Sequence, residues 1–183
     1  MQLSQVLGRL LPRLLPGMSL DGPRNALRDA WDVLANLPGG RVLFSRLLGR
    51  IAPYTGSIGA NVAELRPGFA QVVMPDRRAV RNHLQSVHAI ALANLAECAG
   101  NLALAYSLPD DARFIVTGLE IEYTKKARGP ITALADCQVP GSAIRAEYPI
   151  SISLRDGTGE EVARALLHSL VGPKPGRDPT QFN

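Results

Sequence analysis

The sequence predicts an α+β domain in which an antiparallel sheet of about six strands wraps around one long central helix. Three observations lead to this fold class. An almost wholly apolar helix lies near the middle of the chain, segments with alternating apolar and polar residues flank it, and amphipathic helices precede them. A single helix with so little polar surface must be covered by the sheet to bury its faces.

Length and composition agree with one such domain. The chain has 183 residues, of which 46% are hydrophobic and 20% are charged, and this is an ordinary composition for a soluble globular protein. No apolar run reaches the roughly 18 residues of a membrane span. The two cysteines are too few for a disulfide framework and suit a reducing compartment, so we expect a cytoplasmic protein.

Residues 1–56 are predicted to form an N-terminal helical segment that packs on the main domain. Helical patterns cover 24–37 and 41–51, and proline–glycine pairs separate them. The first residues carry leucines at helical spacing, interleaved with Arg9 and Arg13, and the whole net charge of +4 lies in the first 50 residues. Contact with a membrane surface is one interpretation, but we favour packing on the domain or on a partner subunit.

The main domain is predicted to span 57–171. Segments 58–65 and 69–74 read as a β-hairpin around a proline–glycine turn, and a polar, basic loop follows over 75–87. After the central helix, four segments with strand patterns are expected, and a turn of the type Asp-Gly-Thr-Gly joins the last two. These four segments are 113–125, 130–139, 147–155 and 161–171, followed by a tail, 172–183, that is predicted to be disordered.

The central helix is predicted over 89–106, because this stretch lacks proline and is rich in alanine and leucine, with Ser86 as a plausible N-cap. Gly100 indicates that another backbone passes close to the helix. The only strongly polar side chains inside the helix share one stripe: Asn94, Glu97 and Asn101.

Two interpretations of this stripe remain open from the helix alone. It can be the solvated face of an amphipathic helix. It can also hold a buried carboxylate, Glu97, that flanking amides position toward a cleft, as a general base or nucleophile requires.

The residues around the helix start carry a spacing that favours the second interpretation. Asn82 is followed six residues later by His88, and Glu97 comes nine residues after the histidine. On this spacing and on the order of strands over 57–171, the chain resembles the hotdog-fold acyl-CoA thioesterases. The resemblance is to the branch typified by phenylacetate-pathway and 4-hydroxybenzoyl-CoA thioesterases.

The resemblance implies a role for each matching residue. The backbone N–H of Ala89 would polarise the thioester carbonyl, and Glu97 would act as general base or nucleophile. Asn82 and His88 would order the loop and the attacking water, and Thr117 is a candidate to hold that water. A helix N-terminus supplies unpaired N–H donors where the oxyanion would form. The family pattern has two glycines after the histidine, whereas this chain has Ala89 and an isoleucine.

The resemblance also implies an acyl-CoA substrate, no cofactor, and a homodimer or dimer of dimers with the site at the subunit interface. The basic loops before and after the helix are candidates to meet the phosphates of coenzyme A. The proposed substrate-binding residues are Asn94, Asn101, Arg81, Lys125, Lys126 and Arg128.

Other functions find less support in the sequence. His83 and His88 match no metal-ligand spacing, so no metal site is predicted. No nucleophile elbow, phosphate loop or dinucleotide fingerprint is present, and nucleic-acid binding is not favoured because the chain lacks aromatic interleaving and a net basic domain. A hotdog dehydratase is not favoured either, because the chain has no histidine–glutamate pair arranged for dehydration. The alternative that we retain is a non-catalytic protein that binds acyl-CoA or a lipid.

Overall fold

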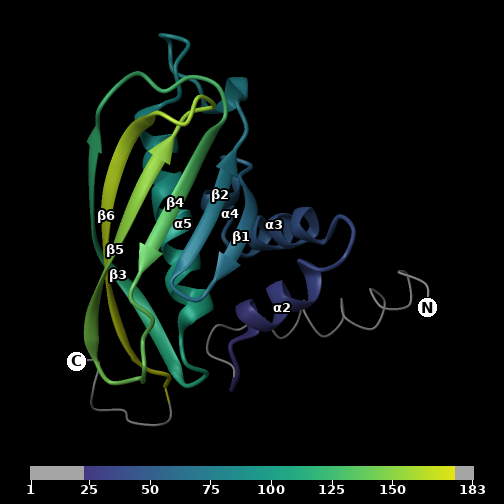
Figure 1. The fold of residues 1–183 in the computed structure, drawn as a ribbon, viewed down its shortest axis with the longest axis vertical. Coiled ribbons are helices and arrows are strands. Elements are labelled where there is room, and N and C mark those ends of the chain that lie inside the picture. The colour runs from purple at the N-terminus through teal and green to yellow at the C-terminus, as the bar shows by residue number, and fades with distance from the viewer. Residues whose placement is uncertain (1–22, 176–183) are drawn as a thin grey trace.

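The computed structural model describes residues 23–175, in which one antiparallel sheet curves around one long helix, α5 (Figure 1). The sheet has six strands in the order β1-β2-β4-β5-β6-β3, so the predicted fold class is confirmed. The elements are α2 (Ala26–Leu34), α3 (Gly40–Ile51), α4 (Pro53–Gly56), β1 (Asn61–Arg66), β2 (Phe69–Met74), the 3-10 turn η1 (Arg78–Val80), α5 (Ala89–Ser107), β3 (Ala112–Tyr123), β4 (Ile131–Cys137), β5 (Ala146–Arg155) and β6 (Glu161–Pro173).

Helix α5 forms the centre of the hydrophobic core. By length and composition it could span a membrane, but 67% of its apolar stretch is buried inside the protein, as in the core helix of a globular fold. Gly100 lies where α5 approaches the sheet. A Cβ there would come within 2.7 Å of Leu167 Cδ2 and 3.4 Å of Ile152 Cδ1. The close neighbours of Gly100 are therefore side chains of the sheet, and the prediction of a nearby backbone was wrong.

The helices before the sheet pack on each other and on strand β1. Trp31 of α2 meets Phe44 of α3 edge to face, with ring centroids 5.1 Å apart. The hydroxyl of Ser45 in α3 accepts a hydrogen bond from the Val62 N–H at 2.9 Å, and the Arg41 guanidinium donates to the Ala63 carbonyl at 2.7 Å. Helix α3 thus covers polar backbone groups on the outer edge of β1, where a bulge interrupts pairing with β2.

The opposite edge of the sheet, strand β3, has no such cover in the described structure. Strand β3 ends the strand order and pairs only with β6, and no described element covers its outer edge. Along this strand the Ile115 side chain is 60% exposed. A long, bare edge strand is a template for pairing with another strand, and folded proteins usually protect it.

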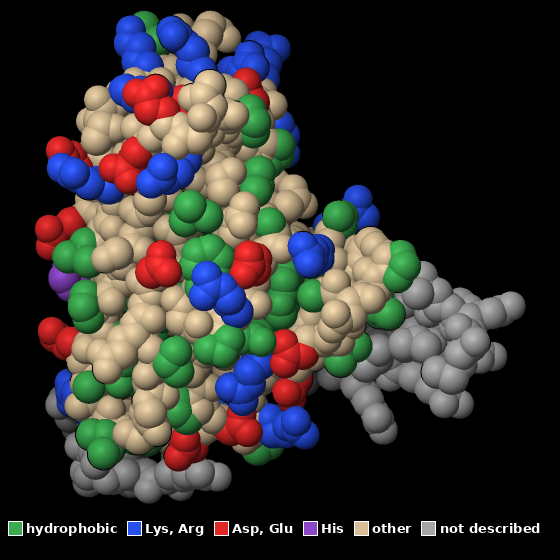
Figure 2. Space-filling view, in the orientation of Figure 1, with side chains coloured by type: hydrophobic (Ala, Val, Ile, Leu, Met, Phe, Trp, Pro, Cys, Tyr) green, Lys and Arg blue, Asp and Glu red, His purple; other side chains and the backbone are tan. Residues whose placement is uncertain are grey.

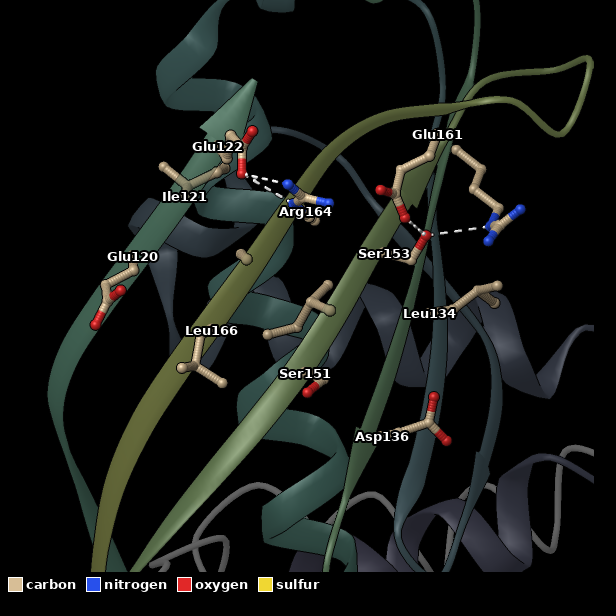
Figure 3. Close-up of a pocket in the computed structure, with 13 residues that line it drawn as sticks. Glu120, Ile121, Glu122, Leu134, Asp136, Ser151, Ser153, Glu161, Arg164 and Leu166 are labelled. Carbon is tan, nitrogen blue, oxygen red and sulfur yellow. Dashed lines mark hydrogen bonds and ion pairs between the residues drawn. The ribbon is translucent and has the colours of Figure 1, made fainter. Parts of the chain in front are cut away.

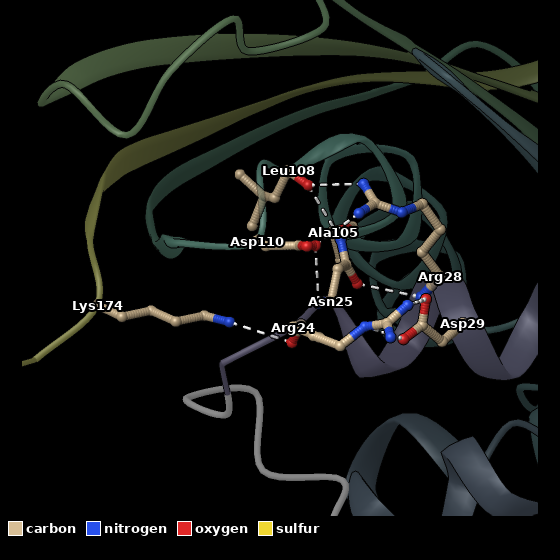
Figure 4. Close-up of polar contacts among 8 residues, drawn as sticks. All are labelled: Arg24, Asn25, Arg28, Asp29, Ala105, Leu108, Asp110 and Lys174. Carbon is tan, nitrogen blue, oxygen red and sulfur yellow. Dashed lines mark hydrogen bonds and ion pairs between the residues drawn. The ribbon is translucent and has the colours of Figure 1, made fainter.

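Helix α2 is tied to the end of α5 by one buried asparagine (Figure 4). Asn25 caps α2 by accepting from the Arg28 N–H at 3.1 Å. Its amide donates to the carbonyls of Ala105 at 2.7 Å and Leu108 at 3.2 Å. Arg28 also donates to the Leu108 carbonyl at 3.0 Å and forms an ion pair with Asp110 at 2.6 Å. One side chain therefore caps the start of one helix and the end of another.

Asn25→Ala is expected to lower the free energy of unfolding by about 2 kcal/mol, because it removes an N-cap and leaves two carbonyls of α5 without their donor. Urea denaturation measures the change. The matched control is Asn36→Ala, since the Asn36 amide bonds only the Asp32 carbonyl, at the exposed surface. This variant should stay within about 0.5 kcal/mol of the wild type. Equal losses in both variants would contradict the role given to Asn25.

Some predicted segments differ from the structure at their ends or lie outside it. Strand β6 continues to Pro173, and Lys174 is buried, so the first residues of the predicted tail 172–183 belong to the ordered fold. The rest of that tail, and the leucine and arginine pattern that suggested membrane contact, lie outside the described residues 23–175.

Candidate functional site

The start of α5 presents one free backbone donor. His88 is the N-cap, with φ −67° and ψ 138°, and its Nδ1 accepts from the Ile90 N–H at 3.1 Å. The prediction of Ser86 as N-cap was wrong, because Ser86 is buried and its hydroxyl donates to the Asn82 side chain. Within the described part of the chain, the Ala89 N–H has no hydrogen-bond partner. Ala89 is also exposed, so a ligand can reach its N–H.

Asn82 organises the loop that leads into the helix. Its side-chain oxygen accepts from the Leu84 N–H at 2.9 Å and from the Ser86 N–H at 3.2 Å. Gln85 in this loop adopts a left-handed φ of 57°, a conformation that the Asn82 hydrogen bonds hold in place. The structure therefore shows Asn82 shaping the loop before His88.

The open face of α5 is a single stripe. Between Ala89 and Asn101, the positions that are not buried after Ala89 are Ile90, Ala93, Glu97 and Asn101, at spacings of three and four residues. Glu97 is half-buried and makes no hydrogen bond or ion pair with any residue in the range 23–175. An unpaired carboxylate thus lies on the same face as the free donor at the helix start.

Asn94 does not share this open face. It is buried, and its amide donates to the Tyr54 carbonyl at 3.0 Å, which attaches α5 to the short helix α4. The sequence pattern placed Asn94 with Glu97 and Asn101 as a candidate for substrate binding, whereas the structure gives its amide a protein partner.

Strand β3 runs beside the open stripe. The Tyr123 hydroxyl donates to the Ala89 carbonyl at 3.1 Å, and Phe114 borders a cavity that Asn101 also borders. The strand and the helix are therefore antiparallel. Thr117 lies between these two contacts, is exposed, and occupies a β-bulge at which pairing with β6 shifts register. A bulge re-aims side chains locally, and this one falls beside the middle of α5.

A cavity of about 170 Å³ lies at the far end of the stripe, between α5, the helices α2 to α4 and strand β3. Its walls are mainly hydrocarbon, and they include Cys98 and Asn101 of α5. Burial and, to a lesser extent, the neighbouring Glu97 carboxylate together raise the pKa of the Cys98 thiol to about 12. The Cys98 thiol therefore stays protonated at neutral pH and acts as apolar lining.

The basic residues that were predicted to contact the phosphates of coenzyme A lie at one end of the molecule, where loop 75–88 meets the loop after β3 (Figure 2). Two of the side chains proposed to bind substrate already have protein partners. Arg81 makes two hydrogen bonds of 2.7 Å to Asp76, and Lys125 is paired with Asp156 and Glu160. In the described residues, the exposed side chains of Lys126 and Arg128 make no ion pair.

A larger hollow, of about 610 Å³, lies on the outer face of the sheet, away from α5 (Figure 3). Some of its polar groups already have partners. Arg164 bonds Glu122 at 2.7 and 2.9 Å, and Ser153 donates to Glu161 at 2.7 Å. Its lining residues all belong to strands, so no helix start within residues 23–175 borders it, and we place the candidate site on α5 instead. Among residues 23–175, no three His, Cys, Asp or Glu side chains are arranged to hold a metal ion.

Comparison with solved structures identifies the class of fold. A structural-genomics target, APC5556, is 32% identical, with a TM-score of 0.70, and the match covers 80% of this chain and 98% of that one. A Pseudomonas aeruginosa protein of unknown function, PA5026, described as a "probable thioesterase", is 25% identical, with a TM-score of 0.64 and coverage of 75% and 97%. The thioesterase HI1161 from Haemophilus influenzae is 16% identical, with a TM-score of 0.62 and coverage of 71% and 91%. These likenesses confirm the hotdog fold.

The family follows from the sequence match. Residues 40–171 match the family described as "Domain of unknown function (DUF4442)", and the chain belongs to that family. The match begins inside the N-terminal helices, at the first residue of α3. No curated protein matches the sequence. The narrower resemblance, to phenylacetate-pathway and 4-hydroxybenzoyl-CoA thioesterases, stays a prediction.

Proposed function

We propose that this protein is a cytoplasmic thioesterase that hydrolyses the thioester bond of an acyl-coenzyme A. The observation that carries the proposal is the pair of unsatisfied groups on the open stripe of α5, the Ala89 N–H and the Glu97 carboxylate. One is the donor that an oxyanion needs, and the other is the acceptor that a water nucleophile needs. Solved structures described as thioesterases share the fold and support the same conclusion.

In the proposed reaction the thioester carbonyl oxygen accepts a hydrogen bond from the Ala89 N–H. Glu97 takes a proton from a water whose oxygen attacks the carbonyl carbon. The tetrahedral intermediate then breaks its carbon–sulfur bond, and the proton on Glu97 passes to the departing thiolate. If Glu97 attacks directly, an anhydride forms and water hydrolyses it in a second step.

Along a single α5 the two groups are widely separated. Ala89 and Glu97 are eight residues apart, which is a rise of about 12 Å, whereas a bound thioester carbonyl should lie about 3 Å from the N–H and be joined to the carboxylate by one water. We therefore infer that Glu97 of one protomer acts with the Ala89 N–H of a second copy. Antiparallel pairing of two β3 edges would reverse the direction of the second α5 and bring its N-terminus level with Glu97.

Ile115→Lys is expected to shift the protein from dimer to monomer, because lysine on an edge strand opposes strand pairing. Multi-angle light scattering measures the mass in solution. Ile144→Lys is the matched control, since Ile144 is 75% exposed in the loop between β4 and β5, away from β3. A wild-type protein that is monomeric throughout, or an equal effect of both variants, would refute pairing through β3.

The exposed Lys126 and Arg128 are proposed to contact the phosphates of coenzyme A. They lie in the loop after β3, and the Ala127 carbonyl between them accepts from the Val87 N–H at 2.9 Å, so this loop lies against the start of α5. From phosphate groups bound here, the pantetheine arm of coenzyme A would have to run back along the protein for the thioester to reach the helix N-terminus.

The proposed activity is tested by incubating the full chain with a panel of acyl-CoA thioesters and a thiol reagent that reports free coenzyme A. Hydrolysis above the background rate is expected for at least one member. Saturable binding without turnover would instead identify a non-catalytic acyl-CoA-binding protein, and the absence of both would reject the proposal.

A further inference from the structure

Asn101 lines the cavity beside α5, and the hydrogen bonding of its side chain is incomplete. Its Oδ1 atom is covered by the protein and has no hydrogen-bond partner among residues 23–175, so the amide has to turn to present this oxygen to the cavity. Apart from Asn101, Thr55 and the protonated thiol of Cys98, the walls of the cavity are hydrocarbon. A buried amide oxygen without a donor is costly, and native structures rarely leave one unless a ligand or water completes it.

The cavity also lies in the right place for the acyl part of a substrate. It extends along α5 from Cys98 to Ala105, and Asn101, which also lines it, lies four residues after Glu97 on the same face of the helix. An acyl group whose thioester carbon is at Glu97 would therefore enter the cavity at that end. A volume of about 170 Å³ is close to the ~150 Å³ of an engineered apolar cavity that binds benzene, so it suits a group of roughly six carbon atoms.

We propose that the cavity between α5 and the helices α2 to α4 binds the acyl group, and that Asn101 selects aliphatic acyl groups that carry a hydroxyl. This inference rests on the proposed thioesterase function and adds a substrate class to it. A hydroxyl both donates and accepts, so it pairs with the Asn101 amide whichever way the amide is turned. A plain alkyl chain fills the same space but leaves the Asn101 oxygen without a donor.

The position of the hydroxyl follows from the helix geometry. Glu97 and Asn101 are four residues apart on α5, a rise of about 6 Å, which an extended chain covers in roughly five carbon–carbon bonds. The structure therefore points to a hydroxyl on the sixth carbon, counted from the thioester carbon. The probe pair is 6-hydroxyhexanoyl-CoA and hexanoyl-CoA, which differ only in that hydroxyl.

Binding is measured by titration calorimetry on the Glu97→Gln variant, so that hydrolysis does not consume the probes. The hydroxylated probe should bind about tenfold more tightly, because only this probe supplies a donor to the buried oxygen. Adding Asn101→Leu should abolish the difference. Adding Thr55→Val instead, which removes the other hydroxyl-bonding side chain of the cavity, should preserve it. The wild type should show the same preference in kcat/KM.

Each outcome decides a separate question. Equal binding of the two probes, or a preference that survives Asn101→Leu, would overturn the role of Asn101. Loss of the preference in the Thr55→Val variant would move that role to Thr55 and would also overturn it. If the wild type hydrolyses no member of the acyl-CoA panel, these two probes included, but binding keeps the preference, the thioesterase function is rejected while the hydroxyl-selecting cavity is retained.

Discussion

Glu97→Gln is expected to lower kcat for acyl-CoA hydrolysis by about 10²- to 10⁴-fold, because glutamine cannot take the proton of the attacking water or attack the thioester itself. The substitution keeps the size of the side chain and adds no strain to α5. In the described structure Glu97 makes no hydrogen bond or ion pair, so no structural contact is lost with the charge. Initial rates of thiol release measure kcat and KM separately.

The matched control for this variant is Glu147→Gln. Glu147 is exposed on β5, where it alternates with the buried Ile150 and Ile152 and so faces away from α5, and its loss should leave kcat unchanged. Substrate affinity in Glu97→Gln should stay within a few-fold of the wild type, since the carboxylate is assigned to the chemical step. Full activity in Glu97→Gln would remove this residue from the mechanism.

The fold was predictable because its strongest signals are local. An apolar helix without proline and strands with alternating burial can each be read from short windows of sequence. The order of the strands is not local in this way, because β3 crosses to the far edge of the sheet and pairs with β6. The ends of the helices and strands were less predictable. Helix α5 begins after His88 because the His88 ring accepts the Ile90 N–H, an unusual cap that sequence preferences rank below Ser86.

The cavity could not be predicted, because its walls come from distant parts of the chain. Ala26 and Leu27 of α2 line it together with residues of α5 that come much later in the sequence, and Phe114 joins from the edge strand of the sheet. No periodic pattern in the sequence indicates such long-range contacts. The ion pairs of Arg81 and Lys125 were also missed, since a basic residue in a loop does not indicate which acidic group it will meet, even when that group, as with Asp76, is in the same loop.

The N-terminal helices explain why the two edges of the sheet differ. Ser45 and Arg41 of α3 satisfy backbone groups of β1, so that edge is closed to another strand. The same group of helices forms one wall of the cavity. The helices before the hotdog domain therefore leave β3 as the sheet edge at which a second copy can pair. They also enclose one end of the open stripe of α5 in a cavity.

Ala89→Pro is expected to lower kcat by about 10²- to 10³-fold, because proline has no N–H to donate to the oxyanion. The helix should tolerate this change. Position 89 is the first of α5, where proline is favoured, and the preceding His88 already has the extended ψ of 138° that a following proline requires. Ala89 is exposed, so the ring has room. Steady-state rates and circular dichroism together separate lost chemistry from lost structure.

Ala89→Gly is the matched control, since glycine keeps the N–H and is the residue that the thioesterase pattern has after the histidine. It should retain activity or increase it by allowing the substrate closer to the backbone. An Ala89→Pro variant that folds and keeps full activity would show that the oxyanion is stabilised elsewhere.

Mixing the two inactive variants tests the shared site directly. In a heterodimer of Glu97→Gln and Ala89→Pro chains, a site built across the interface pairs an intact Glu97 from one chain with an intact Ala89 N–H from the other. The second site carries both defects. Random exchange of subunits should therefore restore about a quarter of the wild-type activity. If each protomer holds a complete site, every site in the mixture keeps one defect and no activity returns, so this measurement decides between the two arrangements of the site.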